Sequence, residues 1–258
     1  MHRRALGLAA ILVALAAAPG AWAQDVPVIA AAADLKFAVE EIARAFQEAG
    51  HGTVRLAFGS TGNFARLIEQ GAPFQVFLAA DESFVFRLAD RGLTRDRGDL
   101  YAIGRIVLFV PPHSPLAADG TLADLRAALA AGRVSRFAIA NPDHAPYGRA
   151  AMQALKHAGL WEGLQQVLVL GENVSQAAQF ATTGNSQGGI IAHALALAPQ
   201  MQPMGRFALI PAEWHEPLRQ RMVRLRNAGP VAERFYAFMQ EKQAREIMVR
   251  YGFVLPGE

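Results

Sequence analysis

Short apolar segments alternate with amphipathic segments along this chain, and that alternation restricts the possible folds more than any other feature. Residues 26–32, 53–58 and 74–80 are apolar runs of strand length. Each is followed by a segment with the apolar spacing of a helix, at residues 35–49, 63–70 and 81–90. Strands that alternate with helices in this way predict a parallel sheet covered by helices. Because ligands of such sheets bind beyond the carboxyl ends of the strands, we expect a binding site there.

A second unit of the same kind begins near residue 105. Its predicted strands and helices are, in chain order, 105–110, 122–131, 136–140, 149–158, 166–170, a helix that starts at residue 172, and 188–192. The segment 231–251 has the pattern of one long amphipathic helix. Candidate domain boundaries lie near residues 104–106 and 208–214, so the chain leaves the first α/β domain, builds a second one and returns. Two crossings of this kind form a hinge with a cleft between the domains.

The first 23 residues have the pattern of an export signal. Arg3 and Arg4 are followed by an apolar run of about 14 residues, which is too short to cross a bilayer. Ala21-Trp22-Ala23 matches an A-x-A cleavage site, so we expect the mature chain to begin at Gln24. The sequence has no cysteine and therefore no residue for a lipid anchor. We expect a freely diffusing protein of the periplasm without stable membrane insertion.

Charge and motif content argue against several function classes. The net charge is +3 and falls to +1 when Arg3 and Arg4 are removed, whereas a nucleic-acid partner favours a basic face. The chain has no Walker loop and no HxH or HExxH motif, and we expect no nucleophile elbow. We therefore expect no catalysis, no cofactor and no protein-built metal site, with an enzyme kept as an alternative.

Residues 58–66 form the most informative motif. They have the pattern of a strand end, a Gly-Ser-Thr-Gly turn and a helix start. Such a turn directs backbone N–H groups and the hydroxyls of Ser60 and Thr61 toward one point, which is how proteins bind an oxyanion without a cation. The same hydroxyls would also serve as an ordinary helix cap. Gly59 and Gly62 favour ligand binding, because they let a ligand approach the backbone.

Four further positions lie at expected strand ends or helix starts. Asp34 is an N-cap of the helix that follows it, a residue that selects the ligand, or both. Tyr147 offers a neutral donor, but a tyrosine in this setting is more often a packing residue. Val174 offers only its backbone N–H at a helix start. His193 follows an expected strand, and a lone histidine is more often a core or surface group than a ligand.

Together these stretches resemble the periplasmic molybdate-binding proteins of ABC importers, over essentially the whole mature chain. The shared stretches are residues 30–35, 58–66, 69–73 leading to 80–81, 141–148, 172–174 and 250–253. The resemblance implies a type II periplasmic-binding-protein fold, in which two Rossmann-like lobes close on an oxyanion. It assigns residues 24–105 and 213–258 to lobe 1, and residues 106–212 to lobe 2. It also implies that hydroxyl and backbone N–H groups, without a positive side chain, hold a tetrahedral dianion.

The family's ligand positions match this chain in part. Ser60 and Thr61 match its hydroxyl pair, with Thr61 as the contacting residue. Tyr147 matches a tyrosine that some members use, and Val174 matches the backbone donor. The serine of the first turn is Asp34 here, and the tyrosine after the inner strand is Ala192, with His193 beside it. The ligand set that the resemblance implies is Asp34, Ser60, Thr61, Tyr147, Val174 and His193.

Asp34 is the departure that bears most on the ligand. Two unit charges 4 Å apart repel by about 4 kcal/mol at an effective dielectric constant near 20, and a dianion roughly doubles this value. Three resolutions stay open. The side chain turns into its own helix cap, or it is protonated and donates a hydrogen bond. Otherwise the ligand is a protonated oxyanion, a metal complex or another small polar molecule.

The resemblance implies the solute-binding component of an ABC importer. Such a protein is a monomer that captures an oxyanion, molybdate or tungstate, and delivers it to a membrane permease driven by a separate ATPase. Two alternatives stay open. One is a binding protein for a different small anion, metal complex or polar ligand, and the other is a ligand-sensing subunit of a signalling receptor.

Overall fold

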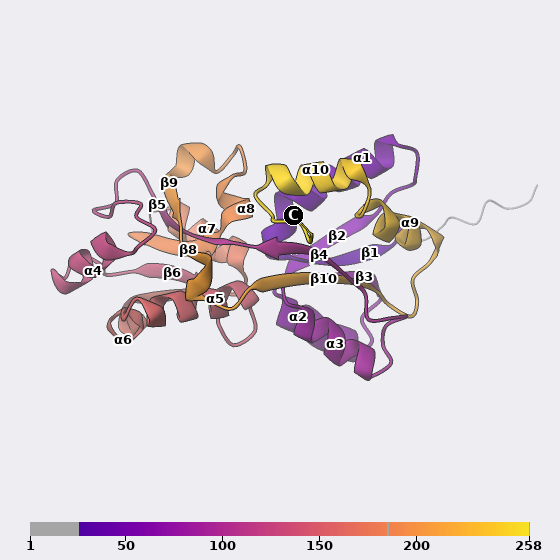
Figure 1. The fold of residues 1–258 in the computed structure, drawn as a ribbon, viewed down its shortest axis with the longest axis horizontal. Helices are drawn as coiled ribbons and strands as arrows, with labels where there is room; N and C mark the ends of the chain where they lie inside the picture. Colours follow the sequence, from indigo (N-terminus) through magenta and orange to yellow (C-terminus); the bar gives the residue numbers. More distant parts are fainter. Residues whose placement is uncertain (1–25, 185, 258) are drawn as a thin grey trace, which may run out of the picture.

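Two five-stranded sheets organise the molecule, one toward each end of its long axis (Figure 1). The structure is a computed structural model that describes residues 26–184 and 186–257. The predicted signal peptide therefore lies outside the described residues. Helices flank both sheets, so the predicted α/β fold with two lobes is confirmed.

The sheet of the first lobe contains the three parallel strands that the N-terminal alternation predicts, together with two others. Its spatial order is β2-β1-β3-β10-β4, and β10 is antiparallel to both of its neighbours. The strands are β1 (Val28–Ala32), β2 (Arg55–Gly59), β3 (Phe74–Ala79), β4 (Asp99–Gly104) and β10 (Leu218–Arg224). The sequence patterns did not predict β4 and β10, which complete the sheet from distant parts of the chain.

Helices cover both faces of this sheet (Figure 1). A short 3-10 helix, η1 (Ala33–Leu35), connects β1 directly to α1. Side chains of β1 alternate between the faces, because successive strand residues point in opposite directions. Ala30 packs with α2 and α3, whereas Ile29 and Ala31 belong to the core on the other face. The helices are α1 (Lys36–Glu48), α2 (Thr61–Glu69), α3 (Glu82–Asp90), α9 (Pro230–Phe238) and α10 (Lys242–Arg250).

The second lobe repeats the arrangement with the order β7-β6-β8-β5-β9. Strands β6, β7 and β8 are parallel, and β5 is antiparallel to β8 and β9. The strands are β5 (Ile106–Val110), β6 (Phe137–Ala140), β7 (Leu168–Gly171), β8 (Gly188–Ala192) and β9 (Arg206–Leu209). The α-helices are α4 (Ala123–Ala130), α5 (Pro146–His157), α6 (Trp161–Leu164), α7 (Val174–Thr182) and α8 (His193–Ala196). Three 3-10 helices complete the list of elements: η2 (Gln165–Val167), η3 (Gln202–Met204) and η4 (Ala212–Trp214).

The chain passes between the sheets twice. Arg105 alone separates β4 of the first sheet from β5 of the second. The return runs from β9 through η4 to β10. Both passages run side by side at the middle of the molecule (Figure 1). The assignment of residues 24–105 and 213–258 to one lobe, and 106–212 to the other, stays a prediction.

The predicted long helix over residues 231–251 is wrong. The structure contains two helices, α9 and α10, separated by residues 239–241. Ile247 lies 12 residues after Phe235, which places it about 120° further around a continuous helix at 3.6 residues per turn. Both residues are buried in one core, Phe235 at 0% exposure and Ile247 at 4%. A break in the helix lets both apolar faces reach that core.

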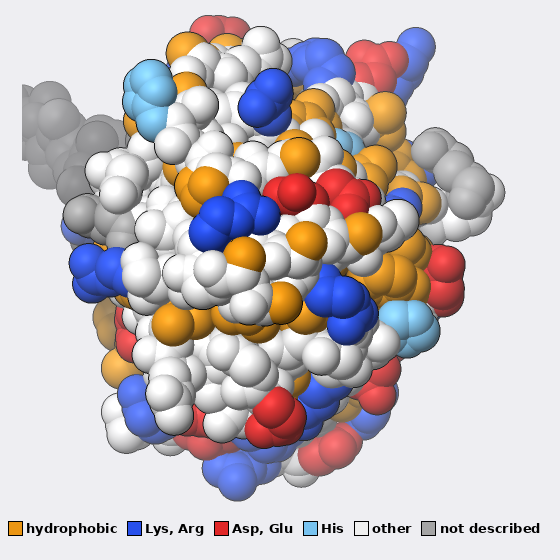
Figure 2. Space-filling view, turned by 90° about the vertical axis from the view of Figure 1, so that its left-hand side faces the viewer, with side chains coloured by type: hydrophobic (Ala, Val, Ile, Leu, Met, Phe, Trp, Pro, Cys, Tyr) orange, Lys and Arg blue, Asp and Glu red, His pale blue; other side chains and the backbone are white. Residues whose placement is uncertain are grey.

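Charged side chains of both signs are spread over the surface. Figure 2 shows the end of the molecule formed by the second lobe, where basic, acidic and apolar side chains are interspersed. Within residues 26–184 and 186–257, no helix has the length and apolar character needed to cross a membrane. The same residues contain no group of three or more His, Asp or Glu side chains placed to hold a metal ion.

Phe46 of α1 packs against α9, and its substitution tests how much this contact stabilises the fold. Its ring is fully buried and meets Phe235 and Phe238 edge-on, with centroids 5.3 and 5.5 Å away. We predict that Phe46→Ala lowers the free energy of unfolding by about 3–5 kcal/mol, because it leaves a cavity among these rings. In urea unfolding, Leu67→Ala serves as the control, since Leu67 is 39% exposed and should change stability by about 0.5 kcal/mol or less. Equal losses of stability in Phe46→Ala and Leu67→Ala would contradict the burial of Phe46 in the core.

Candidate functional site

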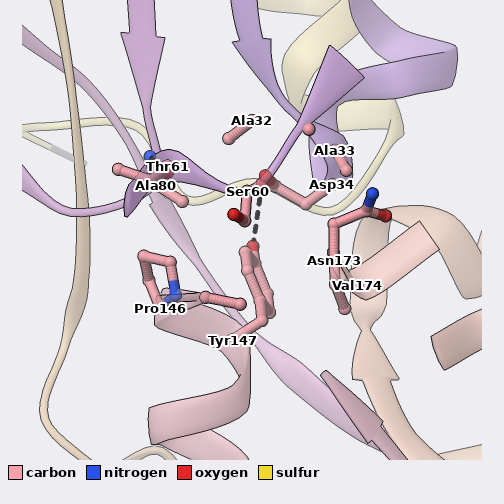
Figure 3. A pocket seen from close by; sticks show the side chains of 12 residues that line it. Ala32, Ala33, Asp34, Ser60, Thr61, Ala80, Pro146, Tyr147, Asn173 and Val174 are labelled. Carbon is pink, nitrogen blue, oxygen red and sulfur yellow. Dashed lines mark hydrogen bonds between the residues drawn. The ribbon is translucent and has the colours of Figure 1, made fainter. Parts of the chain in front are cut away.

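A small pocket lies where strand ends of the first lobe meet helix starts of the second lobe (Figure 3). The ends of β1, β2 and β3 contribute from the first lobe, and the N-termini of α5 and α7 contribute from the second. The residues that line it are Ala32, Ala33, Asp34, Gly59, Ser60, Thr61, Ala80, Ala145, Pro146, Tyr147, Asn173 and Val174. The site therefore lies at the carboxyl ends of parallel strands, where the fold is expected to bind its ligand.

Ser60 and Thr61 lie at the start of α2, as the sequence predicts. Ser60 is the N-cap, and its Oγ accepts a 3.4 Å hydrogen bond from the Asn63 N–H. The Thr61 Oγ1 accepts from the Ala80 N–H at 3.0 Å, which ties α2 to the end of β3. A hydroxyl that accepts one hydrogen bond still has its own proton to donate. Thr61 is fully buried and lines the pocket, so that proton is available to a ligand there.

Tyr147 and Val174 bring the second lobe to the pocket. Pro146 occupies the first position of α5, where a missing N–H costs nothing, and Tyr147 follows in the same turn. Val174 is the first residue of α7, behind the Asn173 cap that accepts from the Gln176 N–H. N–H groups in the first turn of a helix have no partner within the helix, and the helix dipole makes that end positive. Both helix starts suit an anion.

Asp34 does not cap the helix that follows it, so that part of the prediction is wrong. It lies within η1, and the cap position of α1 is Leu35, which makes no side-chain capping bond. The Asp34 side chain instead crosses the pocket, where its Oδ2 accepts from the Tyr147 hydroxyl at 3.0 Å (Figure 3). Only 2% of the residue is exposed. A carboxylate therefore faces the site and bridges the two lobes.

Gln220 completes a network around this carboxylate. Its Nε2 donates to Asp34 Oδ2 at 2.7 Å and to the Tyr147 hydroxyl at 3.0 Å. The Tyr101 hydroxyl donates to Gln220 Oε1 at 2.9 Å, which fixes the orientation of the amide. Gly104 backs the network, and a Cβ at this position would lie 2.2 Å from the Tyr147 hydroxyl oxygen. Gln220 of β10 and Tyr101 of β4 thus fix the position of the Asp34 carboxylate.

Burial raises the pKa of Asp34 from 3.8 to about 6, against the opposing hydrogen bonds from Gln220 and Tyr147. The backbone N–H groups of Asp34 and Leu35 also favour the charged carboxyl. Neither N–H group forms a hydrogen bond with Oδ1 of Asp34, and this oxygen has no other partner. Burial and the charge of Asp34 raise the pKa of Tyr147 and of Tyr101 well above 10. At neutral pH the carboxyl is mostly ionised, and both phenols are donors.

Direct contacts hold the lobes together around the pocket. The Gly62 N–H donates to the His144 carbonyl at 3.0 Å, and His144 Nδ1 lies 2.9 Å from Ser60 Oγ. The Ser175 hydroxyl donates to the Ala33 carbonyl at 2.8 Å. Ion pairing of Arg149 with Asp81 and a hydrogen bond from Asn63 to Glu172 add further links between the lobes. The structure is therefore a closed conformation of the two lobes.

The enclosed space is small. Its volume of about 10 Å³ holds roughly one water molecule. A tetrahedral oxyanion is larger, so it enters only when the lobes separate or when Asp34 and Tyr147 move apart. Of the described residues that line the pocket, none is Lys, Arg or His. The pocket thus offers hydroxyls, helix N-termini and one carboxyl, which suit binding of a small polar ligand.

The pocket lining does not include the predicted ligand residue at the end of β8. Ala192 and His193 do not line the pocket. The His193 ring instead packs edge-on against Phe207, and a Cβ on Gly252 would lie 2.6 Å from its Nδ1. Burial lowers the pKa of His193, and the charge of Arg105 lowers it further. The His193 ring thus packs against β9 and the C-terminal segment and is not part of the pocket lining.

The expectation that the chain lacks a nucleophile-elbow pattern is also wrong at the level of sequence. Residues 184–188 match G-x-S-x-G. They precede strand β8, whereas a nucleophile elbow follows a strand and opens a helix. The Ser186 hydroxyl donates to the Phe180 carbonyl at 2.9 Å. This segment lacks the structural context of the motif.

Sequence reasoning missed three side chains next to the pocket: Gln220, Tyr101 and His144. Gln220 had a detectable signal in the sequence. Apolar Leu218 and Met222 alternate with charged Arg219 and Arg221, which is the two-residue period of a strand and places Gln220 on the apolar face. A glutamine on the buried face of a strand needs polar partners. Tyr101 and His144 had no comparable signal. The pairing of β4 with β10 brings Tyr101 to the site, and the contact between the lobes brings His144 there.

The fold and the pocket define a class of protein: two α/β lobes that enclose a small ligand between strand ends and helix N-termini. A family model described as bacterial extracellular solute-binding protein matches residues 27–254. The chain belongs to this family, which consists of solute-binding proteins and not of enzymes.

Individual relatives cover nearly the whole chain. The molybdate-binding protein ModA of Azotobacter vinelandii is 35% identical over 255 residues, which are 96% of this chain and 98% of the relative. ModA of Rhodobacter capsulatus is 34% identical over 230 residues, 88% of this chain and 87% of the relative. The solved structure of the Azotobacter vinelandii periplasmic molybdate-binding protein superimposes with a TM-score of 0.79 at 30% identity, covering 90% of this chain and 100% of that one.

The raised pKa of Asp34 makes stability depend on pH. Because its pKa is about 6 in the folded protein and 3.8 in the reference state, wild type loses stability relative to Asp34→Asn as the pH rises from about 4 through about 6. We predict that the advantage of Asp34→Asn grows by about 3 kcal/mol between pH 3 and pH 8. Chemical denaturation across this range measures it.

The matched control for this experiment is Asp143→Asn, which alters an exposed aspartate and should change stability by about 0.5 kcal/mol or less. A constant difference between Asp34→Asn and wild type from pH 3 to pH 8 would show that Asp34 titrates alike in the folded and unfolded states.

Proposed function

We propose that this protein is the periplasmic solute-binding component of an ABC importer and that its ligand is a tetrahedral oxyanion, molybdate or tungstate. The observation that carries the proposal is the pocket itself. It collects the hydroxyls of Ser60 and Thr61, the phenol of Tyr147 and the helix start at Val174 in one buried place. The similarity to two proteins named for molybdate binding supports the choice of oxyanion.

The proposed contacts divide between the lobes. Thr61 and Ser60 donate from the first lobe, and the Val174 N–H donates from the second. The Tyr147 hydroxyl joins them when it releases its hydrogen bond to Asp34 Oδ2. Asp34 faces the same space and influences which ligand is accepted. Since both lobes contribute donors, the ligand favours the closed arrangement, as expected for a hinged binding protein. Oxyanion oxygens receive these hydrogen bonds, and no residue ligates the central atom.

The importer role implies a place and partners. We propose that the leader is removed after Ala23 and that the mature chain acts in the periplasm as a monomer. The closed, loaded protein then docks on a membrane permease driven by a separate ATPase. A surface formed by both lobes has the right geometry only when they are closed, so the permease distinguishes loaded from empty protein.

Ligand binding by residues 24–258 tests the proposal. We expect molybdate and tungstate, and neither sulfate nor phosphate at the same concentration, to raise the unfolding temperature at pH 5.5. At 100 times its Kd, a ligand adds about 2.7 kcal/mol to the free energy of unfolding. Failure of all four anions to stabilise the protein would reject the proposed ligand class.

Variants then test the contacts. Thr61→Ala and Tyr147→Phe each remove one donor to a charged ligand, which costs about 1.5–3 kcal/mol, or about 10- to 100-fold in Kd. Calorimetric titration measures the change. Thr182→Ala is the control, because this threonine lies in the last turn of α7 and bonds only to carbonyls of its own helix. Wild-type affinity in both pocket variants would show that the ligand binds elsewhere.

A further inference from the structure

One oxygen of Asp34 is buried without a partner. Its Oδ2 accepts both hydrogen bonds of the network, from Tyr147 and from Gln220. Its Oδ1 is inaccessible to solvent and accepts none. Asp34 lines the pocket, so its carboxyl borders the space that the ligand enters. A buried acceptor without a donor is costly and points to a missing partner.

A fully deprotonated oxyanion cannot be that partner. All of its oxygens are acceptors, and so is an ionised carboxylate. Two acceptor oxygens come into contact only when a proton lies between them. The remaining groups at the pocket, the hydroxyls and helix N–H groups, can satisfy the other ligand oxygens. The contact with Asp34 alone requires a proton that the dianion does not bring.

Contacts within the first lobe hold the Asp34 carboxyl at the pocket, and they persist when the lobes separate. Gln220 holds its Oδ2 and is itself oriented by Tyr101. A Cβ on Gly104 would collide with the Tyr147 hydroxyl and with Gln220 Nε2, so the network is closely packed on this side. Since 98% of the residue is excluded from solvent, a rotation toward water would require breaking this packing. The carboxyl therefore stays in the site when the ligand is bound.

We propose that this site binds its oxyanion together with one proton, which is shared between Oδ1 of Asp34 and a ligand oxygen. The proposal rests on the proposed function and specifies the chemistry of that same site. At neutral pH the proton comes from solvent, and it returns to solvent when the lobes open and the anion leaves. Whether it formally belongs to the carboxyl or to the anion does not change the balance of charge and protons in the complex.

Other titratable and charged groups lie near Asp34, and the experiment has to distinguish their effects from that of Asp34. Tyr147 and Tyr101 face Asp34 from α5 and β4, and their raised pKa values keep them protonated throughout the experiment. His144 contacts Ser60 Oγ, and its Nε2 lies 3.5 Å from Glu172. Arg149 pairs with Asp81 beyond the end of β3. Because His144 contacts a serine that lines the pocket, a variant at this position serves as the control.

The pKa of about 6 in the free protein sets the expected pH dependence. A nearby dianion raises it further, so the bound carboxyl stays protonated at higher pH. Binding then takes up about half a proton at pH 6 and about one proton at pH 8. The Kd for molybdate rises about tenfold for each pH unit above about 7.

Calorimetric titration of residues 24–258 with micromolar molybdate measures both quantities. Titrations at pH 5, 6, 7 and 8, each in two buffers of different ionisation enthalpy, give the number of protons taken up per anion bound. Asp34→Asn keeps the shape of the side chain and can donate a hydrogen bond without a proton from solvent. For this variant we expect no proton uptake and a Kd that is independent of pH. His144→Asn should retain an uptake of about one proton at pH 8.

The outcomes separate this proposal from the proposed function. Molybdate binding by wild type with a constant Kd and no proton uptake between pH 6 and 8 would overturn the proton-coupled site and leave the oxyanion function intact. Loss of the proton uptake in His144→Asn, together with its retention in Asp34→Asn, would also overturn the assignment of the proton to Asp34 and leave the oxyanion function intact. Absence of binding in wild type and in Asp34→Asn at every pH would reject the oxyanion function, and the proton coupling with it. Should Asp34→Asn fail to fold, the wild-type titrations still decide the question.

Discussion

The buried carboxylate of Asp34 is the constraint on which the rest of the site depends. It joins the end of β1 to Tyr147 on α5 and to Gln220 on β10, and so connects both lobes and a distant strand through one oxygen. Burying a charge is costly unless hydrogen bonds compensate. That cost explains why donors from Tyr147 and Gln220 surround the carboxylate, and why Tyr101 orients the Gln220 amide.

Around this carboxylate, the fold supplies the opposite electrostatic character. The starts of α2, α5 and α7 converge on the pocket, and each helix start carries partial positive charge on its N–H groups. The scaffold therefore favours an anion, whereas Asp34 opposes a dianion. A fold shared with relatives determines where a ligand binds, and individual side chains determine its chemistry. In this chain the two levels agree only if a proton accompanies the anion.

Local patterns predicted the elements well where one segment contains the whole signal. Ser60 caps α2 and Asn173 caps α7, as the turn residues indicated. Errors arose where distant segments compete. The helix over 231–251 breaks because both of its apolar faces pack on one core. Asp34 does not cap α1, and its Oδ2 instead accepts a hydrogen bond from Gln220, which is 186 residues away in sequence.

The sequence by itself determined the alternation of strands and helices over residues 26–90 and 105–192, and the α/β class that follows from it. It also determined the positions of Ser60, Thr61, Tyr147 and Val174 at turns, because periodicity and turn chemistry are local properties. Only the tertiary structure decided that β10 enters the first sheet, that His193 lies away from the pocket, and that Asp34 bridges the lobes. These outcomes depend on packing and on hydrogen bonds between residues far apart in the chain. A local pattern can indicate that a segment is a strand, but it does not show which distant segment that strand contacts.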